Sequence, residues 1–298
     1  MEPYGLVLSG GGGKGAYQLG VYEALAEKGY LDAITSISGA SIGAINMILI
    51  ANDSVETAVQ VWSDITPLTI FDTDWELLDL KEGTFSREEM LFLMKEYINL
   101  PRVSQCTKRL HVSVSRKTAA ATYENEDVLI NAMSPEDITD YILASSSLPI
   151  IHEEVLIHGI LYRDGGLTDN FPIAPVYRDG CRTIIAVGLK EEMKKLEQKY
   201  PDVRFLSIYP SVPLGDLFSG TLNFSQKDIQ IRRKLGYRDT LRQIAVFETN
   251  DTRLLRNEPE LAKLDYLQIL AEQKQETLQS NISYHQDKLR DIMNKYDM

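Results

Sequence analysis

The stretch YGLVLSGGGGKGAYQLGVYEALAEKG, residues 4–29, decides the fold. Its first six residues predict a strand, and the glycines after them lead into an apolar-periodic helix from about Lys14 until Gly29 ends it. A second short strand is predicted at 33–38, and the apolar segment at 42–52 predicts a second helix. Strands and helices that alternate in this way are typical of a parallel sheet covered by helices.

A serine stands between the second strand and the second helix. Gly39-Ala40-Ser41-Ile42-Gly43 fits the pattern GxSxG, in which small residues permit a sharp turn that exposes the serine at its apex. The N-terminal dipole of the following helix would favour a developing alkoxide on Ser41. The same residues also fit a plain turn in which Ser41 only caps the helix.

The glycines after the first strand form a second candidate site. Gly10, Gly11, Gly12, Gly13, Lys14 and Gly15 offer backbone N–H groups that can converge on one negatively charged oxygen. The run matches GxGxxG, but Asp32 precedes the second strand, whereas a dinucleotide site needs an acidic residue at that strand's end. No Ser or Thr follows Lys14, which excludes a Walker loop. An oxyanion hole beside the serine is the remaining function for this loop.

Asp164, Gly165 and Gly166 follow a predicted strand at 160–163. Glycines there would let a short carboxylate approach another loop at the same end of the sheet, where ligand sites of open α/β sheets gather. Alone the triplet is most often a turn. Its occurrence after a glycine cradle and a serine elbow, each at a strand end, points to a site.

The pattern of strands and helices continues to about residue 210. Further strands are predicted at 109–115, 118–124, 183–189 and 204–210, and further helices at 55–65, 87–98 and 190–200. Ser134 and the three residues after it form a capping box that opens a helix toward Leu143. We expect one α/β core over residues 1–210.

These motifs resemble the patatin-like phospholipases. The resemblance rests on GGGGKG at 10–15, GASIG at 39–43, ASSSLP at 144–149 and DGGLTDNFP at 164–172, and it extends over roughly residues 4–210. It implies a three-layer α/β/α fold with a mostly parallel central sheet, no metal, no cofactor, and hydrolysis of fatty acyl esters of lipids. The resemblance makes Ser41 the nucleophile, Asp164 its base, and the amides of Gly11, Gly12 and Gly13 the oxyanion donors.

In this mechanism Asp164 accepts the proton of Ser41, the hydroxyl attacks the ester carbonyl, and water later releases the fatty acid. An unperturbed aspartate, with a pKa of about 3.9, is a weak base near neutrality. We therefore expect partial desolvation to raise the pKa of Asp164.

Three other functions compete with this one. A Ser-His-Asp triad could use Ser41, Asp164 and His285, although His285 lies on a predicted helical stripe. A catalytically silent scaffold could recruit partners through its C-terminal helices, and a dinucleotide-binding oxidoreductase is the most distant alternative. His111, His152 and His158 lie within or beside strands and have no second His or Cys at ligand spacing, so each is expected to be structural rather than a metal ligand.

Residues 211–298 are expected to form a helical C-terminal region packed on the core. From Asn257 onward a heptad pattern gathers apolar residues on one stripe, which Gln268, Gln275 and His285 interrupt. The stripe consists of Leu261, Leu264, Ala271, Leu278, Ile282, Leu289, Ile292 and Tyr296. It serves either a dimerising or partner-binding helix or an appendage packed on its own sheet, and the second is our expectation.

The segment LTIFDTDWELLDLKEG at 68–83 mixes Phe71, Trp75 and leucines with acidic residues. It is either a lid that contacts lipid or an ordinary part of the core. Residues of this kind belong more often to a core.

Composition limits the partners of the chain. The formal net charge of -12 over 298 residues disfavours binding to nucleic acid and electrostatic capture by anionic membranes, so any membrane contact would be transient. The two cysteines are too few for a disulfide framework. The N-terminus lacks the basic start and cleavage site of a signal peptide, and the apolar run at 42–51 is too short to span a bilayer. We expect a cytoplasmic enzyme of lipid or acyl ester substrates, with a homodimer and export by another route left open.

Overall fold

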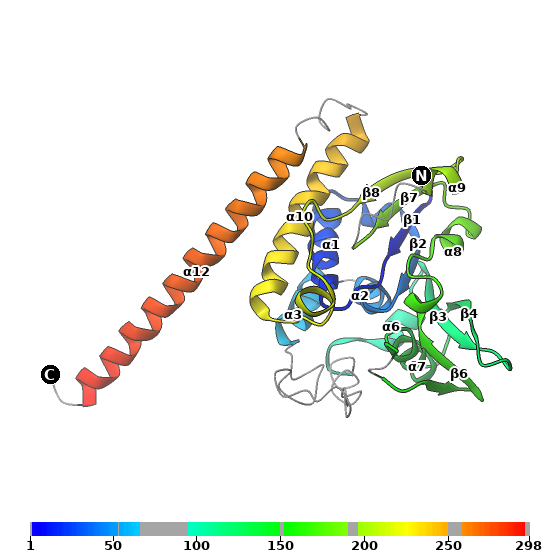
Figure 1. Cartoon of the computed structure of the whole chain (residues 1–298), viewed down its shortest axis with the longest axis horizontal. Helices are drawn as coiled ribbons and strands as arrows, with labels where there is room; N and C mark the ends of the chain where they lie inside the picture. The colour runs from blue at the N-terminus through cyan, green and yellow to red at the C-terminus, as the bar shows by residue number, and fades with distance from the viewer. Residues whose placement is uncertain are drawn as a thin grey trace.

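The computed structural model describes residues 2–52, 54–65, 95–149, 152–189, 196–249 and 258–295. A twisted central sheet lies between helices on both of its faces, and one long C-terminal helix lies outside them (Figure 1). Within the described residues, none of the helices combines the length and the apolar character that crossing a bilayer would require.

In the described part of the chain the sheet contains eight strands in the order β5-β6-β3-β2-β1-β7-β8, with β4 paired to β3. Their bounds are β1 Tyr4–Leu8, β2 Ile34–Ala40, β3 Arg109–Lys117, β4 Tyr123–Leu129, β5 Val155–Ile157, β6 Ile160–Asp164, β7 Thr183–Val187 and β8 Arg204–Ile208. The strands β3, β2, β1, β7 and β8 run parallel to one another, whereas β4 and β6 pair antiparallel with β3, and β5 pairs antiparallel with β6. The expected mostly parallel sheet is confirmed.

Helices cover the two faces of the sheet unequally. The larger face packs against α1 (Ala16–Glu27), α2 (Ile42–Ala51), α3 (Val55–Asp64), α7 (Pro135–Ser145) and α10 (Gln226–Thr249), and the other against α8 (Ile173–Arg178) and α9 (Leu196–Lys199). A short helix, α6 (Leu100–Ser104), precedes β3, and α12 (Glu258–Lys295) packs on the outside of α10. The α/β/α layering that the resemblance implied is therefore present.

Side chains of β1 alternate between two apolar cores. Leu6 and Leu8 belong to the larger cluster under α1, α2 and α10, whereas Val7 belongs to the smaller cluster under α8 and α9. All three side chains are buried, as expected for a central strand covered on both faces. The continuous apolar run YGLVL follows from this double burial.

The pairing along β3 brings two strand ends together. Ala40, the last residue of β2, pairs with Ser113, and Asp164, the last residue of β6, pairs with the next residue, Val114. The partner strand β4 runs along both stretches of β3, so β2 and β6 must share the opposite edge. Because β2 runs parallel and β6 antiparallel to β3, their carboxyl ends meet head to head, at Ser41 and Asp164.

One predicted strand is wrong in its position. Residues 118–122, expected to belong to a strand, form a turn in which Thr118 N donates to Thr122 O at 2.8 Å and Ala121 adopts a φ of 58°. The strand β4 follows at Tyr123–Leu129 and is polar because it lies at an edge of the sheet, partly open to solvent. The apolar residues before it had suggested an earlier start.

Three other expectations fall wholly or partly outside the described residues. The segment 68–83, with its choice between lid and core, lies outside the described residues, as do most of the predicted helix 87–98 and the first part of 190–200. The first predicted helix begins at Ala16 instead of Lys14, because residues 12–15 form a separate turn of 3₁₀ helix, η1.

The heptad stripe of the C-terminal helix does not pack on the sheet. α12 contacts α10 through a different face, in which Ala262, Ile269 and Gln273 are buried. Leu261 and Leu278 of the stripe are 50% and 53% exposed. The appendage therefore packs on α10 rather than directly on the sheet, and the residues of the stripe do not make this contact.

The helices α1 and α10 cross at two glycines. A Cβ added at Gly20 would lie 1.8 Å from the carbonyl oxygen of Arg233, and one added at Gly236 would lie 2.0 Å from the carbonyl oxygen of Tyr17. Only the absence of side chains permits the two backbones to approach so closely. Residues beyond 210 are thus packed directly on the first helix.

We predict that Gly236→Val lowers the free energy of unfolding by about 2–3 kcal/mol, because the added side chain forces the helices apart. Urea denaturation followed by circular dichroism measures the change. Ala245→Val adds methyl groups on the exposed side of the same helix and should change stability by less than about 0.5 kcal/mol. Equal losses in the two variants would contradict the close crossing.

Candidate active site

Ser41 occupies a sharp turn between β2 and α2. Its φ of 55° and ψ of -126° are rare for a residue with a side chain, and they arise because the strand must reverse into the helix within one residue. The turn lies beside the first strand, because Gly43 is so close to β1 that an added Cβ would meet Leu8 O at 2.3 Å. Gly39, at the end of β2, faces Gly43 within the same turn.

Asp164 faces Ser41 from the end of β6. Ser41 Oγ donates to Asp164 Oδ2 at 2.7 Å, and the Gly166 amide donates to Asp164 Oδ1 at 2.7 Å. Both side chains are buried, at 6% and 3% exposure. The carboxylate is therefore fixed by one oxygen and free to interact with the serine through the other.

Burial changes the acid–base behaviour of this aspartate. Loss of solvation raises the pKa of Asp164 to about 6, although the hydrogen bonds from Ser41 and Gly166 act in the opposite direction. The direction agrees with the expectation from sequence. An aspartate with such a pKa is ionised near neutrality and is a stronger base than an exposed one.

The glycine loop lies next to Ser41. A Cβ on Gly10 would lie 3.0 Å from Ser41 Cβ, and Gly12 adopts the left-handed φ of 56° that lets the chain turn there. The Gly10 amide donates to Asn170 O at 3.3 Å and is thus engaged. The amides of Gly11, Gly12 and Gly13 have no hydrogen bond within the described part of the chain. Three adjacent donors are consequently available beside the serine.

Arg232 of α10 anchors this loop from the C-terminal region. Its guanidinium is buried and donates to the carbonyl oxygens of Gly13 at 3.1 Å, Asn223 at 2.7 Å and Ser219 at 2.8 Å. With the Gly13 carbonyl held by the arginine, the neighbouring peptide planes are oriented as well. Nothing in the sequence pattern identified Arg232, because its partners are backbone atoms from distant segments.

A chain of buried side-chain amides holds the two ends of the glycine loop, at Ser9 and Gly15. Gln18 donates to Ser9 O at 2.8 Å, and Asn46 donates to Gly15 O at 3.1 Å and to Gln18 Oε1 at 2.8 Å. Trp62 completes the chain by donating to Asn46 Oδ1 at 2.9 Å. Asn46, which interrupts an apolar helix in the sequence, therefore has a structural reason to be there.

Ser145, at the end of α7, holds the backbone of the serine turn. Ser41 N donates to Ser145 Oγ at 2.9 Å, and Ser145 Oγ donates to Ser113 O at 2.7 Å. The hydroxyl thus links the turn to the strand that both halves of the site share. Sequence reasoning noted the segment ASSSLP but gave this residue no role.

The remaining glycines and the lysine of the motifs complete the walls of the site. Gly165 lies against Ser113 O and Gly15 against Ile42, each at a distance that leaves no room for a side chain. Lys14 is buried and runs close to Gly220 of the short helix η6 (Leu217–Thr221). The motif residues of the sequence are therefore gathered around one end of the sheet.

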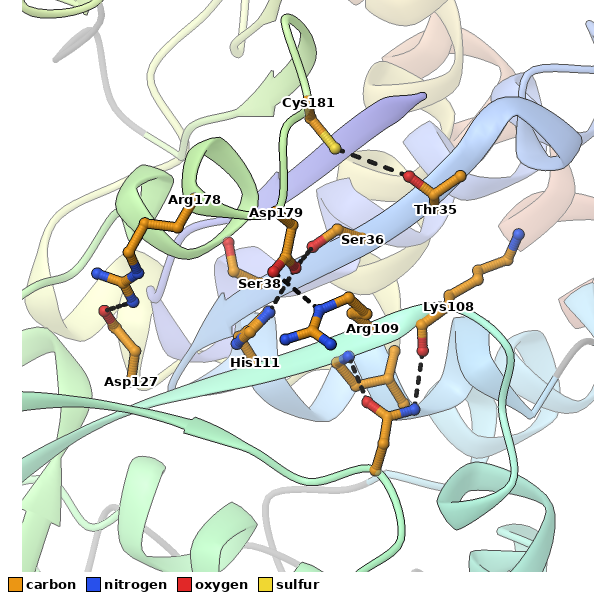
Figure 2. A network of polar contacts seen from close by, with 12 residues as sticks. Thr35, Ser36, Ser38, Lys108, Arg109, His111, Asp127, Arg178, Asp179 and Cys181 are labelled. Carbon is orange, nitrogen blue, oxygen red and sulfur yellow. Dashed lines mark hydrogen bonds and ion pairs between the residues drawn. The ribbon is translucent and has the colours of Figure 1, made fainter. Parts of the chain in front are cut away.

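The four histidines of the chain lie elsewhere. His111 bonds to Asp179 Oδ2 at 2.7 Å in a polar cluster with Ser36 and Arg109, which joins the end of α8 to β2 and β3 (Figure 2). Burial opposes ionisation there, but hydrogen bonds from Ser36 and His111 hold the pKa of Asp179 below its ordinary value. This polar cluster links the layer of α8 to the central sheet and has a structural role.

Among the bonds of the described residues, none joins the other three histidines to Ser41 or Asp164. His152 Nδ1 accepts from Leu148 N at 3.1 Å, and His158 pairs with Asp137 at 2.9 Å. His285 is exposed on α12, a helix whose C-terminal end runs away from the sheet (Figure 1). A triad of Ser41, Asp164 and His285 is therefore incompatible with this arrangement.

We predict that Asp164→Asn stabilises the protein at pH 8 by about 2 kcal/mol. The pKa of Asp164 in the folded chain, about 6, lies above its ordinary value of 3.8, so the stability contributed by the protonated form is lost as the pH rises from 4 to 6. Urea unfolding at pH 8 and pH 4 checks this, since the difference between the variant and the wild type should vanish at pH 4. An equal gain at both pH values would contradict the shifted pKa.

For Ser145→Ala we expect a loss of about 2 kcal/mol in the free energy of unfolding, because the Ser41 amide and the Ser113 carbonyl lose a buried partner. Ser146→Ala is the matched control, since Ser146 Oγ donates only to carbonyls of its own helix among the bonds described, those of Ile142 and Leu143. Its loss should remain below about 1 kcal/mol. Thermal or urea unfolding that ranks the two variants the other way would refute the linking role of Ser145.

Comparison with known proteins agrees with this geometry. A family model described as Patatin-like phospholipase matches residues 6–177. Lysophospholipase NTE1 of Candida glabrata is 26% identical over 218 residues, which cover 67% of this chain and 11% of that protein. The protein of the same name from Saccharomyces cerevisiae is also 26% identical over 218 residues, covering 67% of this chain and 12% of its own. The chain thus spans only about a tenth of the length of these relatives.

A solved structure shares the fold. Human GIVD cytosolic phospholipase A2 aligns with a TM-score of 0.52 at 11% identity, covering 87% of this chain and 60% of the human one. At this identity the similarity concerns the arrangement of strands and helices. The family model spans more than half of the residues and includes the glycine loop, the serine turn and Asp164, so the chain belongs to the patatin-like phospholipase family.

Proposed function

We propose that this chain hydrolyses fatty acyl esters of lipids with Ser41 as the nucleophile and Asp164 as its base. The observation that supports the proposal most strongly is the 2.7 Å hydrogen bond from Ser41 Oγ to a buried carboxylate whose pKa is raised to about 6. A serine hydroxyl needs such a base to become nucleophilic near neutral pH.

In the first step Asp164 Oδ2 takes the proton from Ser41 Oγ, and the oxygen attacks the ester carbonyl. The proton then passes to the leaving alcohol as the acyl–serine bond forms and the ester C–O bond breaks. In the second step Asp164 takes a proton from water, the hydroxide attacks the acyl carbonyl, and the proton returns to Ser41 as the fatty acid leaves. Asp164 is regenerated as a carboxylate at the end of the cycle.

The amides of Gly11, Gly12 and Gly13 are the proposed donors to the tetrahedral oxyanion. They lie at the start of η1, beside Ser41, and they donate no hydrogen bond to another group of the described chain. Arg232 holds the Gly13 carbonyl and so restrains the backbone that carries these donors before substrate binds. Preorganised donors of this kind each contribute roughly 10²- to 10³-fold in rate.

A lipid substrate is supported by the surroundings of the site. A cavity of about 730 Å³ lies at the carboxyl ends of β7 and β8, next to the glycine loop, and its walls include Lys14, Leu189, Val212 and Leu214. Its size lies within the range of pockets that bind small organic ligands. Because the similar NTE1 proteins carry the name lysophospholipase, we propose glycerolipid esters as the substrate class.

Transient contact with a membrane surface belongs to the same proposal. Leu217 and Phe218 on η6 are 53% and 60% exposed beside the glycine loop, and Leu167 is 47% exposed just after Asp164. Exposed apolar side chains on two sides of a site suit contact with the lipid from which the substrate is drawn. We also propose self-association through α12, because that helix exposes apolar side chains on one face.

The test is hydrolysis of lysophospholipid and acyl esters of increasing chain length by purified protein with EDTA present. Ser41→Ala and Asp164→Asn should each lower kcat by at least about 10³-fold, since they remove the nucleophile and its base. His285→Ala should retain wild-type kcat. In the wild type, kcat/KM should rise with pH and reach half of its plateau near pH 6, where Asp164 ionises.

Circular dichroism shows whether each variant is folded. A folded His285→Ala that is inactive would replace the dyad with a triad, and a flat profile between pH 5 and pH 8 would remove Asp164 as the base. A wild-type protein inert on every ester would favour a catalytically silent scaffold.

A further inference from the structure

The C-terminal helix α12 has two distinct long faces. One face carries Ala262 and Ile269, which are buried against α10. On the other face Leu264, Leu278 and Ile282 are 62%, 53% and 56% exposed. A run of large apolar side chains open to solvent on one side of a helix is uncommon unless something covers it.

The exposed face has the spacing of a coiled-coil seam. Its residues alternate three and four positions apart, which is the pattern of the a and d positions of a heptad, over three heptads. The seam runs through Leu261, Leu264, Gln268, Ala271, Gln275, Leu278, Ile282 and His285. In the same heptad Ala262 and Ile269 fall at position b and Gln273 at position f, on the outer side of a coiled coil. The helix can therefore pack on α10 through one face and on a second helix through the other.

In the second half of α12, beyond Glu276, which pairs with Lys234 of α10, the described side chains from Thr277 to Gln286 are open to solvent. The helix is 38 residues long, about 57 Å. Side chains from Lys274 to Gln286 are all exposed. Figure 1 shows this half projecting past α10 and the rest of the protein. Because most of the stability of a protein helix comes from packing of its apolar face, this half would gain stability from packing against a partner.

We propose that the occupant of this face is α12 of a second copy of the chain, paired antiparallel. In the register that we propose, Gln268 lies opposite His285 of the second copy, Ala271 opposite Ile282, and Gln275 opposite Leu278. Polar residues then meet in one layer, and the small alanine meets a large isoleucine. The projecting half of each helix packs along the body-bound half of the other.

The layers favour the antiparallel arrangement over a parallel one. A parallel pair would place Ala271 against Ala271, which leaves a void, and His285 against His285. Glu260 at position g would also face Asp265 at position e of the second helix, both of them acidic.

Charge along the helix favours the same orientation. Residues 258–273 contain four acidic residues and one lysine, whereas residues 274–295 contain four basic and three acidic residues. Antiparallel pairing therefore sets the acidic half of one helix beside the basic half of the other. Asp265 and Glu272 already pair with Arg238 of α10, so the packing of the layers carries more of the preference than charge does.

Sedimentation velocity of the full chain at micromolar concentration tests the proposal. The wild type should sediment as a dimer, and Leu278→Glu combined with Ile282→Glu should raise the dissociation constant by at least about 100-fold. The matched control is Ser280→Glu combined with Ser283→Glu, which adds the same charge at exposed outer positions of the same helix and should leave the dimer intact. Unchanged helicity by circular dichroism separates loss of the dimer from loss of the fold.

Disulfide formation tests the orientation. A Gln268→Cys chain mixed with a His285→Cys chain, both carrying Cys106→Ser, should form a cross-link between the two different chains. The Gln268→Cys chain alone should remain unlinked. Cross-linking of Gln268→Cys with itself would overturn the antiparallel register.

Two other results would overturn the dimer itself. One is a wild-type monomer throughout the concentration range. The other is a monomer that floats with phosphatidylcholine vesicles and loses this property in the Leu278→Glu, Ile282→Glu variant, which would make the seam a lipid-binding surface. A dimer that survives that variant would also refute the proposal, since another surface would then join the copies.

Discussion

The hydrogen bond from Ser41 Oγ to Asp164 Oδ2 joins two strand ends that are 123 residues apart in the chain. The two meet because β2 and β6 share one edge of β3 and run toward each other along it. Burial of the pair makes the carboxylate a better base and costs stability at the same time, since an ionised group is held away from water. Much of the surrounding hydrogen bonding serves to keep this arrangement in place.

That support comes from parts of the chain outside the recognisable motifs. Ser145 ties the serine turn to β3, and Arg232 of α10 holds the Gly13 carbonyl of the loop next to it. Arg232 lies beyond the residues that the family model matches. The close crossing of α1 and α10 at Gly20 and Gly236 fixes the position from which the arginine reaches the loop. The C-terminal region is therefore built into the architecture of the site.

Local patterns in the sequence predicted the alternation of strands and helices. The double burial of β1 and the periodicity of α1 each depend on residues that are consecutive in the chain. Ser145 and Arg232 escaped notice because their partners are backbone atoms of remote segments, which leave no local signature. The turn at 118–122 was taken for a strand because its residues are apolar, whereas the edge strand after it is polar. α12 is a helix, as its heptad period predicted, but periodicity alone does not tell which face a protein packs against its own body.

The central claim is that Ser41 is a nucleophile activated by Asp164. Reaction with an alkyl fluorophosphonate, followed by mass spectrometry of the peptides, tests this claim directly because the reagent phosphonylates activated serines. The account predicts one adduct, on Ser41, formed at a rate that falls as the pH drops through about 6 and that falls at least about 10²-fold in Asp164→Asn. An adduct on another residue, or labelling of Ser41 at the same rate in wild type and Asp164→Asn, would contradict it.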